Sequence, residues 1–266
     1  MGSEQLLLLT IGLVAGVVGG LLGVGGSIIM IPAMTLLLGP RQHLYQGAAM
    51  MVNFFVVLPA FYHHRKIKAV LEPIVKPMVP FAAIGVVIGV WLSCGEWFRG
   101  DRQIYLTKVF GCFLVYEVGY NLYRLMSNRR LPEMDEAAAK ALPVWKVALT
   151  VGLPTGLVGG LLGVGGGVVA VPLQQLILRV PLNRAIANSA ATIIPLSVIG
   201  ATFKNLENAA AGMPFRSALH LALLLAPTAI LGGYLGARLT HVVPRRALRI
   251  AFIVFMSYAA VMLIRK

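Results

Sequence analysis

Two short glycine clusters are the residues of this sequence whose types and spacing point most directly to chemistry. One reads GVGGS at residues 23–27, and the other reads GVGGG at residues 163–167. Glycine adopts a positive φ without steric cost, so we expect a helix to break at each cluster. A helix that starts after such a break has first-turn N–H groups without intrahelical partners, at its positive dipole end. The pattern predicts an anion site formed by Gly25, Gly26, Ser27, Gly165, Gly166 and Gly167.

Small polar side chains in the apolar segments after each cluster are expected to complete this site. Asn188 and Thr192 are four residues apart and would share one face of a helix. Hydrogen bonding between helices is the alternative role for such residues, and the sequence leaves both roles open. The predicted binding side chains are Gln46, Asn53, Asn188, Ser189 and Thr192.

One acidic residue, Glu117, lies near the centre of the apolar segment 104–126. A carboxylate at the bilayer centre costs ~2.5–3.5 kcal/mol on insertion scales and is a functional candidate by default. Proton coupling is one role; a neutral or paired glutamate that binds Asn121 or a neighbouring helix is the other. Lys204 lies at the end of an apolar segment, where we expect its side chain to snorkel toward the interface.

The elements that must position these residues are membrane helices. The chain has 266 residues, of which 58% are hydrophobic and 12% charged, whereas a soluble domain carries about 25% charged residues. Only helices and closed barrels satisfy their backbone in lipid, and the alternating pattern of a barrel is absent. We therefore predict an all-α integral protein of the cell membrane, with apolar blocks at 5–39, 44–62, 74–95, 104–126, 144–179, 184–203, 215–237 and 247–264.

The first block is too long for one straight crossing. A helix over residues 5–39 would measure about 52 Å, whereas the hydrocarbon core is ~30 Å thick. We expect blocks 5–39 and 144–179 to turn back as hairpins at their glycine clusters. The glycines upstream of each cluster are expected to pack helices closely. On this basis Gly16→Ala should affect binding less than Gly166→Val.

The chain contains an internal repeat. Residues 12–32 recur as residues 152–172 with 13 of 21 positions identical, and a polar stretch at 127–143 lies between the copies. The sequence predicts two homologous repeats of about four helices each, at 1–126 and 144–266. If blocks 5–39 and 144–179 each cross once, the halves are parallel, and the 23 Lys and Arg residues split 13 to 10 with the termini on the richer side. If both blocks turn back, fifteen of them lie on the linker side and eight with the termini. The positive-inside rule then favours inverted repeats, a cytoplasmic linker and external termini.

The duplicated glycine segments, each followed by an apolar run and a proline, resemble the sulfite exporter TauE/SafE family over essentially the whole chain. Gln46-Gly47-Ala48 and Asn188-Ser189-Ala190 add to the resemblance, because that family often has a Gly-Thr-Ser-like stretch there. The resemblance implies a secondary transporter that exports a small organosulfur anion, such as sulfite or sulfoacetate, by alternating access. An anion channel is the alternative, and a membrane assembly factor without transport activity is a weaker one. The anion, direction, coupling ion and assembly, a homodimer included, stay open.

Other functional classes are disfavoured by what the sequence lacks. The net charge of +14 would suit a nucleic-acid binder, but the basic residues lie almost entirely between apolar runs. They are better explained as basic membrane loops. The chain has no His-Glu-x-x-His, no Gly-x-Ser-x-Gly and no paired intramembrane aspartates. We therefore expect no enzyme activity, no cofactor, no metal and no nucleic-acid partner.

Overall fold

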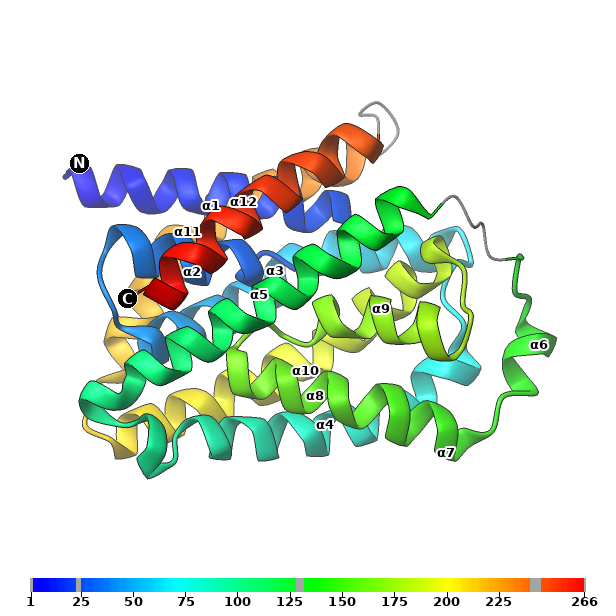
Figure 1. The fold of residues 1–266 in the computed structure, drawn as a ribbon, viewed down its shortest axis with the longest axis horizontal. Coiled ribbons are helices and arrows are strands. Elements are labelled where there is room, and N and C mark those ends of the chain that lie inside the picture. The colour runs from blue at the N-terminus through cyan, green and yellow to red at the C-terminus, as the bar shows by residue number, and fades with distance from the viewer. Residues whose placement is uncertain (1, 23–24, 128–131, 240–244, 266) are drawn as a thin grey trace.

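The computed structural model describes residues 2–22, 25–127, 132–239 and 245–265. In these ranges the protein is helical and has no strands, as the sequence predicts (Figure 1). The elements are α1 (Ser3–Leu22), α2 (Ser27–Leu37), α3 (Gln42–Lys66), α4 (Glu72–Ser93), the 3-10 turns η1 (Glu96–Phe98) and η2 (Gly100–Arg102), α5 (Gln103–Met126), α6 (Glu136–Lys140), α7 (Val144–Val147), the π-helical turn η3 (Ala148–Gly152), α8 (Leu153–Leu162), α9 (Gly167–Ile177), α10 (Leu182–Ala210), α11 (Phe215–Leu239) and α12 (Arg245–Arg265).

The described helices include enough apolar length for a multi-pass membrane protein. Six segments can span a bilayer by length and composition: Glu4–Leu21, Gln42–Lys66, Glu72–Ser93, Val144–Leu162, Leu182–Ala210 and Phe215–Gly236. Helix α12 provides a shorter apolar stretch, Ile250–Arg265, and α5 is not among the six. The protein is therefore an integral membrane protein that crosses the bilayer several times.

Both long blocks reverse direction at their glycine clusters. Helix α1 ends at Leu22 and α2 begins at Ser27, while α8 ends at Leu162 and α9 begins at Gly167. The α1–α2 hairpin opens toward the end of the molecule that holds both termini (Figure 1). The α8–α9 hairpin opens toward the opposite end, where the linker helix α6 lies. Inverted repeats require this arrangement; repeat symmetry and membrane sidedness stay predictions.

The glycines upstream of the breaks bring helices into backbone contact. A Cβ atom on Gly16 would lie 2.2 Å from the carbonyl oxygen of Ala229 in α11, and one on Gly156 would lie 1.9 Å from that of Ala82 in α4. The first helix of each half thus packs on the third helix of the other half, which confirms a packing role. An added methyl group has no room at Gly16, so Gly16→Ala should disturb this packing; its smaller effect on binding than that of Gly166→Val stays a prediction. The same contacts involve Gly12, Gly20, Gly85, Gly89, Gly152, Gly160, Gly232 and Gly236.

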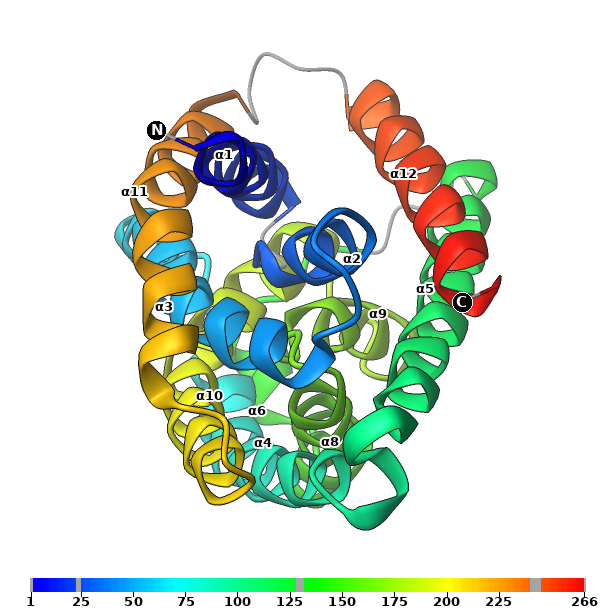
Figure 2. The ribbon, with the colours of Figure 1, turned by 90° about the vertical axis from the view of Figure 1, so that its left-hand side faces the viewer.

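The two short helices lie inside the protein. Figure 2 shows α2 and α9 enclosed by the longer helices. Both are apolar on nearly all sides, and most of their residues are buried, as Met30 and Ala170 illustrate with no exposed surface. A helix that is apolar all round is suited to a core position. The N-termini of α2 and α9 therefore begin in the protein interior.

Candidate functional site

The side chain of Asn53, from α3, closes the first glycine break. Its Oδ1 atom accepts hydrogen bonds from the backbone N–H groups of Gly26 and Ser27, both at 3.0 Å. Its Nδ2 atom donates to the Ser27 hydroxyl at 2.8 Å. Asn53 has no exposed surface. The N-terminus of α2 is thus already capped, by a side chain that the sequence assigns to the binding site.

The second glycine break lies on the other side of the same asparagine. A Cβ atom on Gly165 would lie 2.8 Å from Nδ2 of Asn53, and one on Gly25 would lie 3.0 Å from its Oδ1 atom. Both glycines have positive φ, +68° at Gly165 and +83° at Gly25, as expected for the breaks. They are equivalent positions of the repeat, 140 residues apart. The two breaks therefore meet at Asn53.

Three further polar side chains surround the second break and have unused hydrogen-bonding capacity. Gln46 packs against Gly163, Thr155 against Gly166, and Ser197 lies 3.7 Å from a Cβ atom placed on Gly165. Among the described residues, the Oε1 atom of Gln46 and the hydroxyl oxygens of Thr155 and Ser197 are buried without a partner. Buried polar atoms are normally satisfied. The protein therefore holds unused polar groups at the second break.

Thr155 and Ser197 are not among the predicted site residues. The repeat contains a signal for Thr155, because the otherwise similar first copy has Ala15 at the equivalent position. A hydroxyl group that is present in only one copy of a helix-packing segment indicates that this copy uses a polar group at that position. No comparable signal distinguishes Ser197 from other small polar residues of membrane helices.

The backbone donors of α9 differ from those of α2. In α9 the first backbone hydrogen bonds come from the N–H groups of Val169 and Ala170 to the Gly166 carbonyl oxygen. In the described part of the chain, no side chain accepts from the N–H groups of Gly167 or Val168. Gly166 itself has φ +79°, in the left-handed region that favours glycine. The N–H group of Gly167, which is equivalent to the capped N–H group of Ser27, is thus unoccupied among the described residues.

The three predicted site residues of α10 differ in whether their hydrogen bonds reach the second glycine break. Ser189 donates its hydroxyl hydrogen to the Gly167 carbonyl oxygen at 3.2 Å, next to the second break. Asn188 instead accepts from the Leu71 N–H group at 2.7 Å and donates to Gln174 at 2.9 Å. Thr192 donates to the Asn188 carbonyl oxygen at 2.8 Å. Asn188 and Thr192 thus bind elements toward the linker end, and their binding roles stay predictions.

Glu117 lies in α5 and is buried, with 2% of its surface exposed. Asn121, one turn along the same helix, donates to the Glu117 carbonyl oxygen at 2.9 Å and approaches its Oε2 atom at 3.5 Å. The Oε1 atom has no hydrogen-bond partner among the described residues. The contact with Asn121 is the one expected if Glu117 has a structural role. The unpartnered Oε1 atom is equally compatible with proton binding, so the proton-coupling role stays a prediction.

Lys204 does not snorkel, so that expectation is wrong. Helix α10 continues to Ala210, which puts Lys204 inside the helix with no exposed surface. Its Nζ atom contacts His43 Nδ1 at 2.9 Å, the Ser93 hydroxyl at 2.8 Å and the Cys94 sulfur at 3.3 Å. This cluster could not be predicted from the sequence, because its members come from three helical segments that are far apart in the chain.

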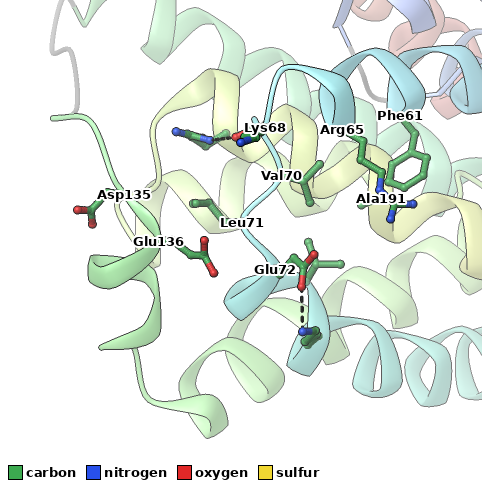
Figure 3. A pocket seen from close by; sticks show the side chains of 12 residues that line it. Phe61, Arg65, Lys68, Val70, Leu71, Glu72, Asp135, Glu136 and Ala191 are labelled. Atoms are coloured by element: carbon green, nitrogen blue, oxygen red, sulfur yellow. Dashed lines mark hydrogen bonds and ion pairs between the residues drawn. The ribbon is translucent and has the colours of Figure 1, made fainter.

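A pocket of about 730 Å³ opens at the linker end (Figure 3). Its lining combines basic side chains of Arg65, Lys68, Lys76 and Arg184 with acidic side chains of Glu72, Asp135 and Glu136. Figure 3 shows the Glu72–Lys76 ion pair, at 2.9 Å, and the Glu136 side chain of the linker pointing toward Glu72. Leu71, which binds Asn188, also lines it.

Comparisons with known proteins identify relatives of the whole chain. It is 30% identical to Probable membrane transporter protein MamO of Paramagnetospirillum magneticum, over 91% of this chain and 41% of that protein. It is 26% identical to Probable membrane transporter protein YdhB of Bacillus subtilis, over 97% of this chain and 100% of that protein. The chain spans less than half the length of the MamO relatives. No solved structure gives a significant match.

The description of the matching family model is "Sulfite exporter TauE/SafE", and the match runs from residue 8 to residue 263. It includes both glycine breaks and the helices that enclose them. Together with the multi-pass helical fold and the membrane-transporter relatives, this match shows the family. The chain belongs to the sulfite exporter TauE/SafE family of membrane transporters.

Proposed function

We propose that the protein is a secondary transporter that exports a small organosulfur anion, such as sulfite or sulfoacetate. The observation that carries the proposal is the meeting of the two glycine breaks at Asn53, with the first-turn N–H groups of α9 unoccupied. These N–H groups are donors at the positive end of a helix dipole. Catalysis is not part of the proposal.

The anion would bind between the breaks without a buried cation. Backbone N–H groups of Gly167 and Val168 would face its oxygen atoms, and the hydroxyls of Ser197 and Thr155 would add donors. Both hydroxyl oxygens are buried and unpartnered among the described residues. Such preorganised donors bind small oxyanions well in a dry interior, where hydrogen bonds to charge are strong. The family name supports the sulfur-containing class of substrate.

Counterflow in proteoliposomes tests transport directly. Vesicles loaded with sulfite should take up labelled sulfite against its gradient, and uptake should saturate with concentration, because a carrier binds one substrate per cycle. Sulfoacetate and a carboxylate of similar size serve as competitors that define the anion class. Uptake that is neither saturable nor stimulated by internal substrate would indicate an anion channel. The absence of any uptake would favour an assembly factor.

Glu117 is proposed as the coupling group. We expect Glu117→Gln to remove the dependence of transport on a pH gradient and to leave anion affinity largely unchanged, since glutamine keeps the shape but cannot bind the proton. Asn121→Ala is the matched control, because it removes the contact to Glu117 and keeps the acid. Proton-driven uptake in vesicles with an imposed pH gradient measures both. Unchanged pH-driven transport in Glu117→Gln would make the residue a structural one.

A further inference from the structure

Buried polar residues line the interface between α3 and α10 from the glycine breaks to the end that holds the termini. On α3 the three residues are seven and three positions apart and share one helical face. On α10, Ser197, Lys204 and Asn208 are seven and four positions apart and share a face, and Asn205 is adjacent to Lys204. Each is at most 7% exposed. We call this set the polar file; it comprises Asn53, Gln46 and His43 on α3, and Ser197, Lys204, Asn205 and Asn208 on α10.

Oxygen atoms along the polar file lack hydrogen bonds. Among the described residues, Oε1 of Gln46, Oγ of Ser197, and Oδ1 of Asn205 and of Asn208 are buried and unpartnered. Native proteins pair almost all such atoms with protein groups or water. The Ser197 hydroxyl can donate to an anion, whereas the three amide oxygens can only accept and are suited to bind water along the polar file.

The polar file ends at a pocket of about 360 Å³. His43, Cys94, Arg99 and Asn208 line it together with Glu207, and Lys204 lies directly behind its wall through its contacts with His43 and Cys94. The pocket also includes Gly100 and Met213, from the α4–α5 and α10–α11 connections. Both connections lie at the end with the two termini (Figure 1).

The hydrogen bonds around Lys204 identify it as the cation of this cluster. Nε2 of His43 lies 2.7 Å from the Phe98 carbonyl oxygen, which can only accept, so Nε2 carries the ring hydrogen. In the neutral tautomer with this hydrogen, Nδ1 can accept from Lys204. The three N–H bonds of an ammonium group match the three acceptors His43, Ser93 and Cys94. The Cys94 sulfur is the weakest and most distant of them.

We infer that the polar file is the route of the anion between the glycine breaks and the pocket at the terminus-bearing end. The Lys204 ammonium group is the cation that binds the anion on this route. An anion in the pocket takes the place of the Cys94 sulfur as the third acceptor of the Lys204 ammonium group. The inference rests on the proposed transport of a small oxyanion and gives that anion a second site. It also assigns a function to a buried lysine that has no carboxylate partner within ion-pair distance in the described ranges.

Charge-selective labelling of Cys94 tests this site without using the transported anion. The chain has two cysteines, so Cys112→Ser leaves Cys94 as the only thiol. Purified protein is labelled with methanethiosulfonates that carry either a sulfonate or a trimethylammonium group. Each rate is divided by the rate with a free small thiol, which removes intrinsic reactivity. The ratio of the two normalised rates then reports the electrostatic preference at the pocket, because changes in thiolate fraction affect both reagents equally.

We expect the ratio to favour the sulfonate reagent in the parent and to fall about tenfold in Lys204→Met, as loss of a nearby charge predicts. Lys204→Arg should keep the preference, and Lys140→Met, at the opposite end, should leave it unchanged. A parent ratio of one or less would overturn the inference even if Lys204→Met does not fold. An unchanged ratio in folded Lys204→Met, or no labelling by either reagent, would also overturn it. Failed counterflow with intact charge selectivity would instead contradict the transport proposal.

Discussion

Gly166→Val is expected to destabilise the protein and to abolish high-affinity anion binding. Gly166 has φ +79°, and an added Cβ atom would lie 2.8 Å from both the carbonyl oxygen and the Cγ2 atom of Thr155. Backbone strain of about 1–3 kcal/mol adds to an overpacking cost of about 1–3 kcal/mol. The shift that relieves the clash also moves the first-turn N–H groups of α9. Thermal unfolding and titration with sulfite measure the two effects.

Gly119→Val is the matched control for this change. Gly119 lies in α5, and an added Cβ atom there would have no neighbour within 4 Å. We expect its stability and affinity to stay close to those of the parent, because valine is tolerated in an exposed helix. Gly16→Ala cannot serve as the control, since its methyl group would meet the Ala229 carbonyl oxygen. Equal affinity in folded Gly166→Val and the parent would show that the cluster only packs helices.

Asn53→Asp is expected to keep the fold and to weaken anion binding about 100-fold at neutral pH. The carboxylate retains the acceptor for the N–H groups of Gly26 and Ser27 and suits the positive end of α2. It also introduces a negative charge between the two breaks. Repulsion from an anion about 5 Å away is ~3 kcal/mol at an effective dielectric constant of 20. Affinity should recover at low pH, where the introduced carboxyl group is protonated; titration across pH measures this.

Asn188→Asp provides the same change of atoms at another buried position. Its carboxylate can still accept from the Leu71 N–H group, and Gln174 can reorient to donate to it. We expect a much smaller loss of affinity than in Asn53→Asp, because the hydrogen bonds of the Asn188 side chain go to Leu71 and Gln174 and not to the glycine breaks. Equal losses would extend the anion site to the linker end. A folded Asn53→Asp protein with parental affinity would remove the site from the breaks.

The features that could be predicted from the sequence are those fixed by local backbone chemistry. A block too long for the bilayer must break, and glycine is the residue that permits positive φ, so both hairpins follow from residues 5–39 and 144–179 alone. Glycines at intervals of four predict close packing, which Gly16 and Gly156 show. The partners of those glycines could not be predicted, since helices of opposite halves form each pair.

Side-chain contacts between distant segments were harder to predict. The amide of Asn53 could bind an anion or a helix end, and only the fold reveals that it caps α2. The apolar block around Lys204 ends at residue 203 by hydropathy, whereas the helix continues for six residues beyond Lys204. Burial of this lysine depends on three acceptors from α3 and the end of α4, and a sequence pattern contains no such pairing.

The exchange of helices between halves also sets the order of assembly during synthesis. Gly16 of α1 meets Ala229 of α11, so α1 enters the membrane long before its partner exists. At about 5–20 residues per second, the ribosome needs ~10–40 s to supply α11. Throughout that time the glycine face of α1 borders lipid or a biogenesis factor. The pairing of α4 with α8 requires a far shorter wait, so we expect α8 to dock on α4 before α1 can dock on α11.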